Sequence, residues 1–284
     1  MRIATWNVNS VNARLATVLA WLEAANPDVV CMQEIKTVDE KFPREDFERL
    51  GYTIATHGQK SYNGVAILSK HPMSDVRRGL PGAEGAGPDG VEDDQARYIE
   101  AMIEAPVPVR VGGIYLPNGN PVVAGPVATG KFAYKLAWME RLRAHAQSLL
   151  AFEEPLVLCG DYNVIPTPAD AKNPQNWVGD ALFQPQSQAA FRALRYLGLS
   201  EAGELGEQPP GTFTFWDYQA GAWQRDNGIR IDFHLLSPQA ADRFRGVETH
   251  RDARDMDKPS DHVPVVIDLD LDSGEATGAQ RRAG

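Results

Sequence analysis

The chain has 284 residues, of which 43% are hydrophobic and 23% charged, and its formal net charge is −10 at pH 7. This composition is close to the globular average, which excludes disordered, collagen-like and disulfide-scaffold proteins. No apolar run approaches the roughly 18 residues that cross a bilayer, so we expect no membrane partner. The 38 acidic residues outnumber the 28 basic ones. That excess alone argues against nucleic-acid binding, but only weakly for an enzyme, because metal-site carboxylates count as negative.

The N-terminus and the cysteines predict a cytoplasmic protein. MRIATWNVNS runs directly into a strand pattern, without the basic and apolar regions of a secretory signal. Cys31 and Cys159 lie in the apolar runs DVVCMQE and LVLCGDYN. Two thiols in separate buried strands are typical of core residues in a reducing compartment.

Short β-branched segments alternate with a few amphipathic ones along the chain. In order we predict strand 2–8, helix 14–25, strands 28–34, 52–58, 64–70, 98–104 and 109–116, helix 131–152, strand 155–163, helix 187–199, and strands 231–237 and 263–269. The second helix has an apolar stripe of Phe132, Leu136, Met139, Leu142 and Leu149.

This order is not a strict βαβ repeat. It predicts an α/β protein of the α+β type, a four-layer sandwich of two mixed sheets packed face to face with helices outside. We predict one domain over residues 1–270 and a disordered tail over 271–284.

Six strand ends carry polar groups suited to chemistry. One Asn or Asp after a strand is usually a turn residue, but turns do not explain six such ends. Strands that converge in a sheet bring their ends to one rim and form a polar cleft there. The residues are Asn7, Asn9, Gln33, Glu34, Tyr115, Asn118, Asp161, Asn163, Asp232, Ser260, Asp261 and His262.

Oxygen donors dominate this set. Glu34, Asp161 and Asp261, with the side chains of Asn7 and Asn163, suit Mg²⁺ or Mn²⁺. Zinc is disfavoured because the chain has no cysteine pair or closely spaced histidine pair.

An imidazole stands beside a carboxylate in Asp261-His262, and Asp232 can bond the second ring nitrogen and hold its tautomer. Such a site attacks a phosphoester with an activated water, while metal and imidazole stabilise charge on the phosphoryl oxygens.

Eight ordered blocks carry a resemblance to a known family: WNVNS, QEIK, HGQKSYNGVAILSK, GIYLPNG, GDYNV, TFTFWDY, NGIRIDF and SDHVPV. Together they resemble the exonuclease III family of apurinic/apyrimidinic (AP) endonucleases, in the endonuclease/exonuclease/phosphatase superfamily that includes DNase I. The resemblance spans nearly the whole chain.

The resemblance implies roles for single residues. Glu34 matches the principal metal carboxylate, Asn7 the amide beside it and Asp261 a further carboxylate near the metal. The implied metal set is Asn7, Glu34, Asp161, Asn163, Asp261 and His262.

The catalytic set follows in the same way. Asp161 matches the aspartate that activates or orients the water, and Asn163 the amide that holds the phosphate. Tyr115 matches a phenol on the phosphate or leaving oxygen, His262 the imidazole that stabilises the transition state, and Asp232 its orienting carboxylate. Either Asp161 or His262 can be the base.

DNA contacts are also implied. Phe215 or Trp216, with Ile229, matches the lining of the abasic-site pocket. These aromatics lie in a segment over 212–223 that we expect to be an exposed loop; the alternative is a β-hairpin with core aromatics, which is equally favoured for Phe213. Asn118 matches a DNA-contacting position, and Asn9 stands where some members carry Asp. Lys60 and Arg97 are favoured among the basic residues that could hold phosphates: Lys36, Lys60, Arg97, Lys131, Lys135, Arg225, Arg230 and Lys258.

The main hypothesis is a Mg²⁺-dependent DNA-repair nuclease, with Mn²⁺ as a substitute. The resemblance implies a monomer that cleaves double-stranded DNA 5′ to abasic sites and clears blocked or recessed 3′ ends. One alternative is another superfamily phosphodiesterase acting on RNA, inositol phosphates or lipid. The other is a non-catalytic nucleic-acid-binding regulator on the same fold.

Overall fold

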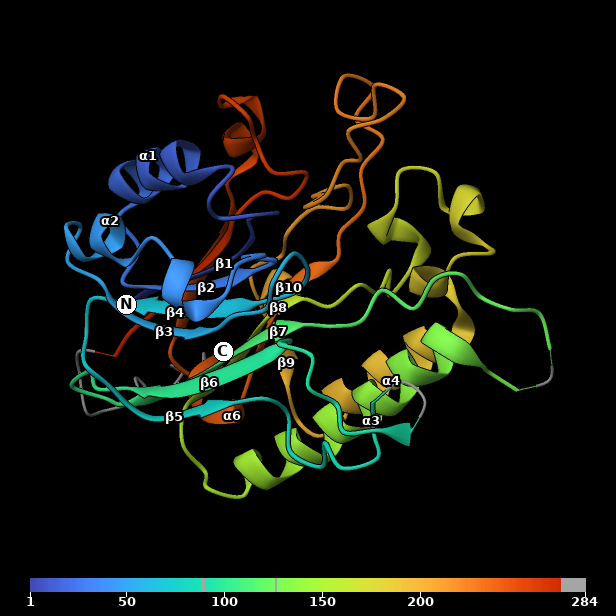
Figure 1. Cartoon of the computed structure of the whole chain (residues 1–284), viewed down its shortest axis with the longest axis horizontal. Helices are drawn as coiled ribbons and strands as arrows, with labels where there is room; N and C mark the ends of the chain where they lie inside the picture. The colour runs from blue at the N-terminus through green and yellow to red at the C-terminus, as the bar shows by residue number, and fades with distance from the viewer. Residues whose placement is uncertain (88–89, 126, 272–284) are drawn as a thin grey trace, which may run out of the picture.

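The computed structural model describes residues 1–87, 90–125 and 127–271 as two stacked β-sheets with helices on both outer faces (Figure 1). The first sheet has the order β11-β12-β1-β2-β4-β3 and contains β1 (Arg2–Asn7), β2 (Val29–Gln33), β3 (Thr53–His57), β4 (Val65–Ser69), β11 (Phe244–Thr249) and β12 (Val265–Leu269). The second has the order β5-β6-β7-β8-β10-β9 and contains β5 (Met73–Arg78), β6 (Tyr98–Ile103), β7 (Val109–Tyr115), β8 (Leu156–Asp161), β9 (Ser200–Glu201) and β10 (Asp232–Leu236).

Each sheet has one central parallel pair, β1 with β2 and β7 with β8, and its other pairs are antiparallel. The two parallel pairs face each other, because β1 packs on β8 and β2 on β7. The predicted α/β sandwich of two mixed sheets is therefore confirmed.

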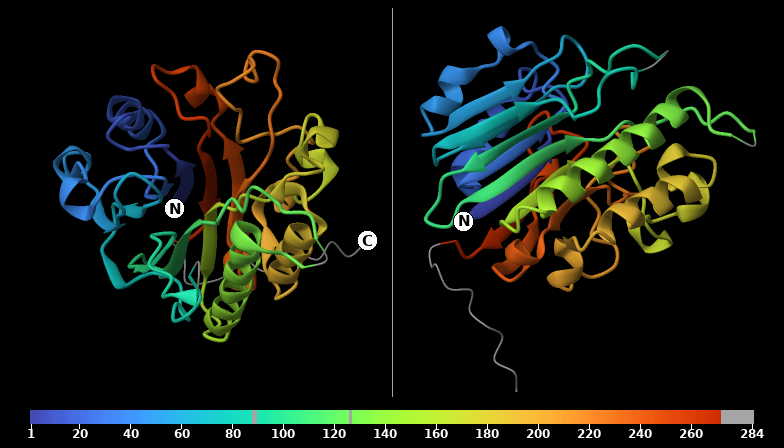
Figure 2. Two further views of the ribbon diagram at one scale, coloured as in Figure 1. Left: turned by 45° about the vertical axis from the view of Figure 1, so that its right-hand side comes forward. Right: turned by 90° about the horizontal axis from the view of Figure 1, so that it is seen from below.

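Helices cover the two outer faces (Figure 2). The first sheet packs against α1 (Leu15–Ala25) and α2 (Arg44–Glu48), and the second against α3 (Gly130–Leu150) and α4 (Pro185–Arg195). Two shorter helices are α5 (Ala202–Leu205) and α6 (Pro238–Ala241). No helix in the described ranges is both long and apolar enough to span a membrane.

The core between the sheets is made by the strand residues that alternate inward. Ile3, Cys31 and Ile67 of the first sheet pack with Val111 and Cys159 of the second. Both cysteines are completely buried and free of a disulfide. Their side chains fill apolar space, as the sequence predicts.

Several elements differ from the sequence prediction. The strands β5 and β11 were not predicted, because both are exposed edge strands whose polar side chains lack a clear alternation. On α3 the buried stripe includes Lys135 and Trp138, whereas Leu136 is only half-buried. Leu271, placed in the predicted tail, is fully buried in the core and accepts a bond from the Val107 amide. The rest of that tail, 272–284, lies outside the described residues.

Candidate active site

The candidate site lies at one rim, where the facing parallel pairs end. Asn7 ends β1, and Glu34 directly follows β2. Tyr115 ends β7 beside Asp161, which ends β8, and the two residues are register partners. The antiparallel strands β10 and β12 begin at this same rim, so Asp232 pairs with Asp161, and His262 precedes β12 by only a short turn.

Asn7 joins the two sheets across this rim. It is completely buried, and its Nδ2 donates to Glu34 Oε1 at 2.8 Å and to Asp161 Oδ2 at 3.0 Å. Tyr115 donates its hydroxyl to the same Glu34 oxygen at 2.9 Å. Burial and the neighbouring charges of Glu34 and Asp161 hold the pKa of Tyr115 well above its usual value, so the phenol remains a donor.

A second cluster lies on the other side of Glu34. Lys36 Nζ is 2.7 Å from Glu34 Oε2 and 2.6 Å from Asn9 Oδ1, and Asn9 in turn donates to Asp261 Oδ1 at 3.1 Å. Burial raises the pKa of Glu34, but the hydrogen bonds from Asn7 and Lys36 and the Lys36 charge outweigh it and lower that pKa overall. Glu34 is therefore a stable carboxylate at neutral pH.

His262 lies between two aspartates. Its Nδ1 is 2.9 Å from Asp232 Oδ2, and its Nε2 is 3.7 Å from Asp161 Oδ2. Thr214 Oγ1 also donates to Asp232 Oδ2, at 2.6 Å. Burial lowers the pKa of His262, but the charges of Asp232 and Asp161 outweigh it and raise the pKa to about 10. Burial raises the pKa of Asp161 to about 7, with the charge of His262 acting in the opposite direction.

Asn163 and Asn118 complete the rim. The Asn163 backbone is in the left-handed region, with φ 47°, and its amide N–H donates to Asp161 Oδ1 at 2.9 Å. Its side chain donates to Leu116 O at 3.0 Å and accepts from Asn118 Nδ2 at 3.4 Å. Asn118 is exposed and lines a cavity next to the site.

The donor set fits a hard divalent cation. Ligand atoms of Asp161, Asp232 and His262 lie within 4.8 Å of one another, and Asp232 Oδ1 is buried without a hydrogen-bond partner. Glu34 and Asn7 adjoin this group through Asp161. Carboxylate and amide oxygens predominate, as Mg²⁺ and Mn²⁺ prefer. Asp232 belongs to this cluster, although the sequence suggested it only as an orienting residue.

An apolar wall stands beside His262. The Phe215 ring meets the imidazole edge to face at 5.0 Å, and the Phe215 backbone pairs with Ile229. Ile229 packs with Ala171 and Trp177 from the loop that follows β8. Trp216 does not join this wall: it is fully buried against Phe213, Ala222, Trp223 and Val263.

The aromatic segment is therefore only partly exposed. Trp216 meets Trp223 edge to face at 4.9 Å, and Arg251 lies 4.8 Å from both rings. The exposed part is the tip, residues 217–221. The sequence places either Phe215 or Trp216 in a ligand pocket, and the burial of Trp216 shows that it is wrong for Trp216. The polar residues between the aromatics suggested exposure, but the Trp216 ring packs against other rings of the same segment.

Comparisons with known proteins agree with this geometry. The model of the "Endonuclease/Exonuclease/phosphatase family" matches residues 4–262. The chain is 32% identical to exodeoxyribonuclease III of Haemophilus influenzae, over 93% of this chain and 98% of that protein. It belongs to the exonuclease III family.

Solved structures support the same assignment. An AP endonuclease from Archaeoglobus fulgidus is 35% identical, with a TM-score of 0.85 over 95% of this chain and 99% of that one. A variant of the 3′ phosphatase NExo from Neisseria, bound to a product DNA hairpin, is also 35% identical, with a TM-score of 0.86 and the same coverage.

Two of the predicted phosphate-binding cations are accessible to solvent, and one of them lies beside the site. Lys60 is exposed. Arg97 lies 4.9 Å from the Tyr115 ring and lines a cavity of about 490 Å³ with Asn118 and Lys131. The cavity opens beside the reaction centre, because Asn118 belongs to both.

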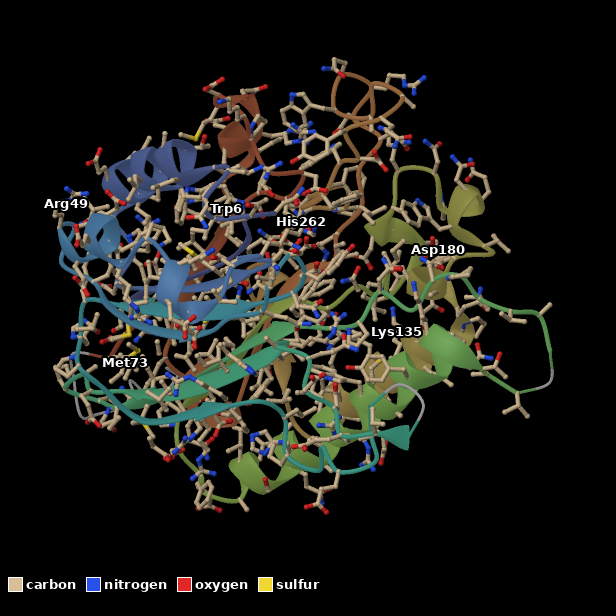
Figure 3. The ribbon with its side chains drawn as sticks, in the orientation of Figure 1. Trp6, Arg49, Met73, Lys135, Asp180 and His262 are labelled. Carbon is tan, nitrogen blue, oxygen red and sulfur yellow. The ribbon has the colours of Figure 1, made fainter. Side chains whose placement is uncertain are left out.

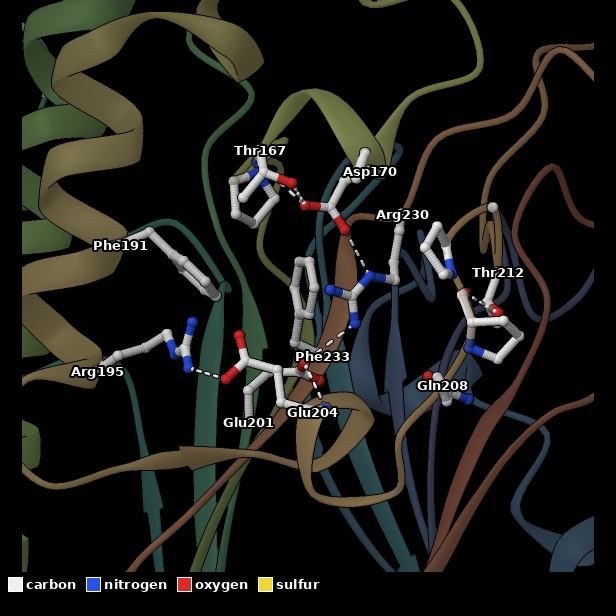
Figure 4. A pocket seen from close by; sticks show the side chains of 15 residues that line it. Thr167, Asp170, Phe191, Arg195, Glu201, Glu204, Gln208, Thr212, Arg230 and Phe233 are labelled. Atoms are coloured by element: carbon white, nitrogen blue, oxygen red, sulfur yellow. Dashed lines mark hydrogen bonds and ion pairs between the residues drawn. The ribbon is translucent and has the colours of Figure 1, made fainter.

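Two other basic residues serve the interior instead. Arg230 lies against a cavity of about 180 Å³ and pairs there with Asp170 at 2.7 Å and Glu201 at 3.0 Å (Figure 4). Lys135 is completely buried, and burial lowers its pKa to about 7, against the attraction of the Asp180 and Asp161 charges. The buried Lys135 is therefore not available to a DNA phosphate, whereas Arg230 is partly exposed and held by its two carboxylate partners.

Sequence reasoning missed two residues that support His262, one through Asp232 and one directly. Thr214 binds Asp232, and its place between Phe213 and Phe215 in an alternating pattern signals that it faces the opposite side from those rings. Trp6 donates its Nε1–H to the His262 carbonyl at 3.1 Å (Figure 3). No local signal indicates that contact, because the two residues are 256 positions apart.

Proposed function

We propose that this protein is a metal-dependent DNA-repair nuclease that cleaves 5′ to abasic sites and clears blocked 3′ ends on duplex DNA. Membership of the exonuclease III family makes the chain a hydrolytic nuclease. The observation that carries the proposal is the Asp161–His262–Asp232 cluster beside both Glu34 and the apolar wall of Phe215 and Ile229. Such an arrangement combines phosphoester hydrolysis with an apolar surface that can contact a sugar without a base.

The metal is proposed to be Mg²⁺, with Mn²⁺ as a substitute. Glu34, Asn7 and Asp161 would hold it, with Asn163, Asp232, Asp261 and His262 around them. A bound cation supplies positive charge that neutralises the phosphoryl oxygens and the leaving oxygen. Lys36 provides part of the counter-charge to Glu34 at the same place.

The proton positions favour Asp161 as the base. The raised pKa of His262 keeps the imidazole charged, so that it cannot accept a further proton at neutral pH. Asp161, whose carboxylate lies 3.7 Å from the imidazole, takes a proton from the attacking water. The water oxygen bonds to phosphorus, the P–O3′ bond breaks, and the 3′ oxygen leaves with the bonding pair and takes a proton from the solvent. The imidazolium stabilises the phosphoryl charge that develops meanwhile.

The apolar wall is proposed to select the abasic sugar. Phe215, which is partly exposed, can cover a deoxyribose that has no base, with the buried Ile229 packed behind it, and a pocket of this kind rejects a full nucleotide by size. Lys60, Arg97, Asn118 and Asn9 are proposed to hold the backbone. Phosphate contacts position a protein without reading sequence, so little base specificity follows.

A cytoplasmic monomer is proposed as the working form. The buried, unpaired cysteines support a reducing compartment. The two sheets already cover each other's apolar faces within one chain, so the core does not call for a second copy.

The deciding experiment uses a labelled duplex with one abasic analogue, beside an undamaged duplex, with Mg²⁺ and with EDTA. We expect metal-dependent incision immediately 5′ of the lesion. Degradation from the 3′ end alone would keep the hydrolytic chemistry and remove the abasic-site proposal. Binding without cleavage under any divalent metal would favour the regulatory alternative.

A further inference from the structure

Lys135 is a buried cation that the hydrolytic mechanism does not use. It lies on α3 with no exposed surface and forms no ion pair with a carboxylate in the described part of the chain. Figure 3 shows it where the helix passes beneath the loops of the site. Burying an ammonium group is costly unless hydrogen bonds compensate, so the hydrogen-bond partners of Lys135 are what makes its burial possible.

Those bonds join the two loops that carry the phosphate-facing amides. Lys135 Nζ donates to the backbone oxygen of Asn118 at 3.1 Å and to that of Asn163 at 2.5 Å. Asn118 belongs to the loop after β7, and Asn163 to the loop after β8. One ammonium group therefore fixes the backbone of both residues whose side chains meet at the rim.

The backbone is shaped around this lysine. Gly119 has φ +89°, and a Cβ there would lie 2.7 Å from Lys135 Cδ and 3.1 Å from Ala181 Cβ. The loop after β7 thus passes directly over the lysine stem, which only glycine permits. The neighbouring Asn120 bonds to Asp180 at 3.0 Å and anchors the far side of the loop.

We propose that Lys135 is a positioning residue for cleavage, which holds the carbonyls of Asn118 and Asn163 so that their amides face the scissile phosphate. This rests on the proposed nuclease function. A positioning group of this kind acts through the amides, and its loss lowers turnover more than substrate binding, because orientation matters most in the transition state.

The first test compares Lys135→Met and Lys135→Arg with the wild type on the abasic duplex. Lys135→Met keeps the length but leaves two buried carbonyls unpaired, and we expect kcat to fall about 30-fold with KM changed less than about threefold. Lys135→Arg restores the donors, so we expect its kcat to be at least about fivefold higher than that of Lys135→Met. The control is His145→Gln on the same helix, where the buried imidazole contacts Glu100 at 2.7 Å, away from the loops. It should lower stability and leave kcat unchanged.

The second test separates positioning from folding, in case the arginine does not fit. In an Asn118→Ala background, Lys135→Met should cost less than it does in the wild type, because one of the two amides that Lys135 positions is gone. Amide hydrogen exchange of residues 117–120 and 163–165 should rise in Lys135→Met, but not in His145→Gln.

The outcomes are distinct. A kcat for Lys135→Met within about twofold of wild type, or unchanged amide hydrogen exchange of both loops in that variant, overturns the role of Lys135. Failure of the wild type to incise any duplex instead overturns the proposed function itself.

Discussion

At the residue scale, the site depends on how charge is divided among three buried groups. His262 is held by Asp232 on one ring nitrogen and faces Asp161 with the other. Two carboxylates outweigh the cost of burial for the imidazolium, whereas Asp161 itself is pushed toward the neutral acid by burial. Different environments thus assign different roles to neighbouring titratable groups, as acid–base catalysis requires.

Replacing either group should therefore remove transition-state stabilisation and spare binding. We expect Asp161→Asn and His262→Asn each to lower kcat by a factor of about 10² or more. Affinity for the abasic duplex, measured by fluorescence anisotropy in Ca²⁺ or EDTA, should change little. A variant with nearly normal turnover would show that its residue has been given the wrong role.

His234 makes a separate prediction about stability. Its ring is buried between the sheets, where a backbone hydrogen bond with Ile3 only partly offsets the loss of water. Burial lowers its pKa from 6.5 to about 3, so the folded state stays neutral while the unfolded state gains a proton below pH 6.5. Stability is thus complete above about pH 6.5 and is lost as the pH falls toward 3.

His234→Leu should remove this loss, which amounts to about 1.4 kcal/mol per pH unit. Between pH 6.5 and pH 5 the variant should gain roughly 2 kcal/mol relative to wild type in urea unfolding. Phe233→Leu, a neighbouring change without a titrating group, should alter the free energy of unfolding by the same amount at both pH values. A parallel pH dependence in His234→Leu and wild type would contradict the assignment.

At the element scale, the strand ends and the segment over residues 212–229 shape the binding surface. The residues 212–229 leave the core at Phe215, expose a tip over 217–221 and return at Ile229. Arg254 lies 5.0 Å from the ring of Tyr218 in the tip and 5.8 Å from the ring of Trp223 at the base, so stacking on one guanidinium fixes both parts of the segment. A fixed base holds Phe215 against the imidazole.

Removing that ring should affect one activity more than another. We expect Phe215→Ala to lower kcat/KM for abasic-site incision by about tenfold, since a large apolar contact to the sugar is lost. Removal of a 3′-phosphate, which does not need the sugar pocket, should fall by less than about threefold. The two substrates are compared in parallel assays with labelled duplexes, and equal losses would argue against the pocket.

At the scale of the whole molecule, an acidic protein has to present a basic surface locally. The net charge is −10. Within the described ranges, however, Lys60, Arg97 and Lys131 form no ion pair with a carboxylate. Phosphate contacts act within a Debye length of about 8 Å at physiological salt, so the distant acidic residues are largely screened.

Salt dependence measures these contacts directly. For catalytically inactive Asp161→Asn on an abasic duplex, about six phosphate contacts give a slope of log K against log salt near −5. Lys60→Glu and Arg97→Glu should each make that slope about one unit shallower. Lys70→Glu is the control, because Lys70 follows β4 at the opposite rim. An unchanged slope in Arg97→Glu would remove that residue from the DNA path.

Local patterns in the sequence determined much of this protein. Strand and helix positions followed from apolar alternation over a few residues, since burial imposes a period of two on strands and about 3.6 on helices. The polar groups at strand ends, including Asn7, Glu34, Asp161 and His262, were identified in the same way. Parallel and antiparallel strands of facing sheets brought those ends together, as converging strands require.

Only the tertiary structure decided which polar and aromatic side chains are buried, and against what. Lys135, Arg230 and Trp216 belong to residue types that often lie at surfaces or ligand pockets. Here Lys135 bonds to two loops, Arg230 pairs with carboxylates, and Trp216 is buried against the rings of its own segment and against Val263. Lys135 lies 28 positions from Asn163, and Arg230 lies 60 from Asp170. A local pattern reports the face on which a side chain lies, whereas its partner is set by segments that meet only when the sheets and helices pack.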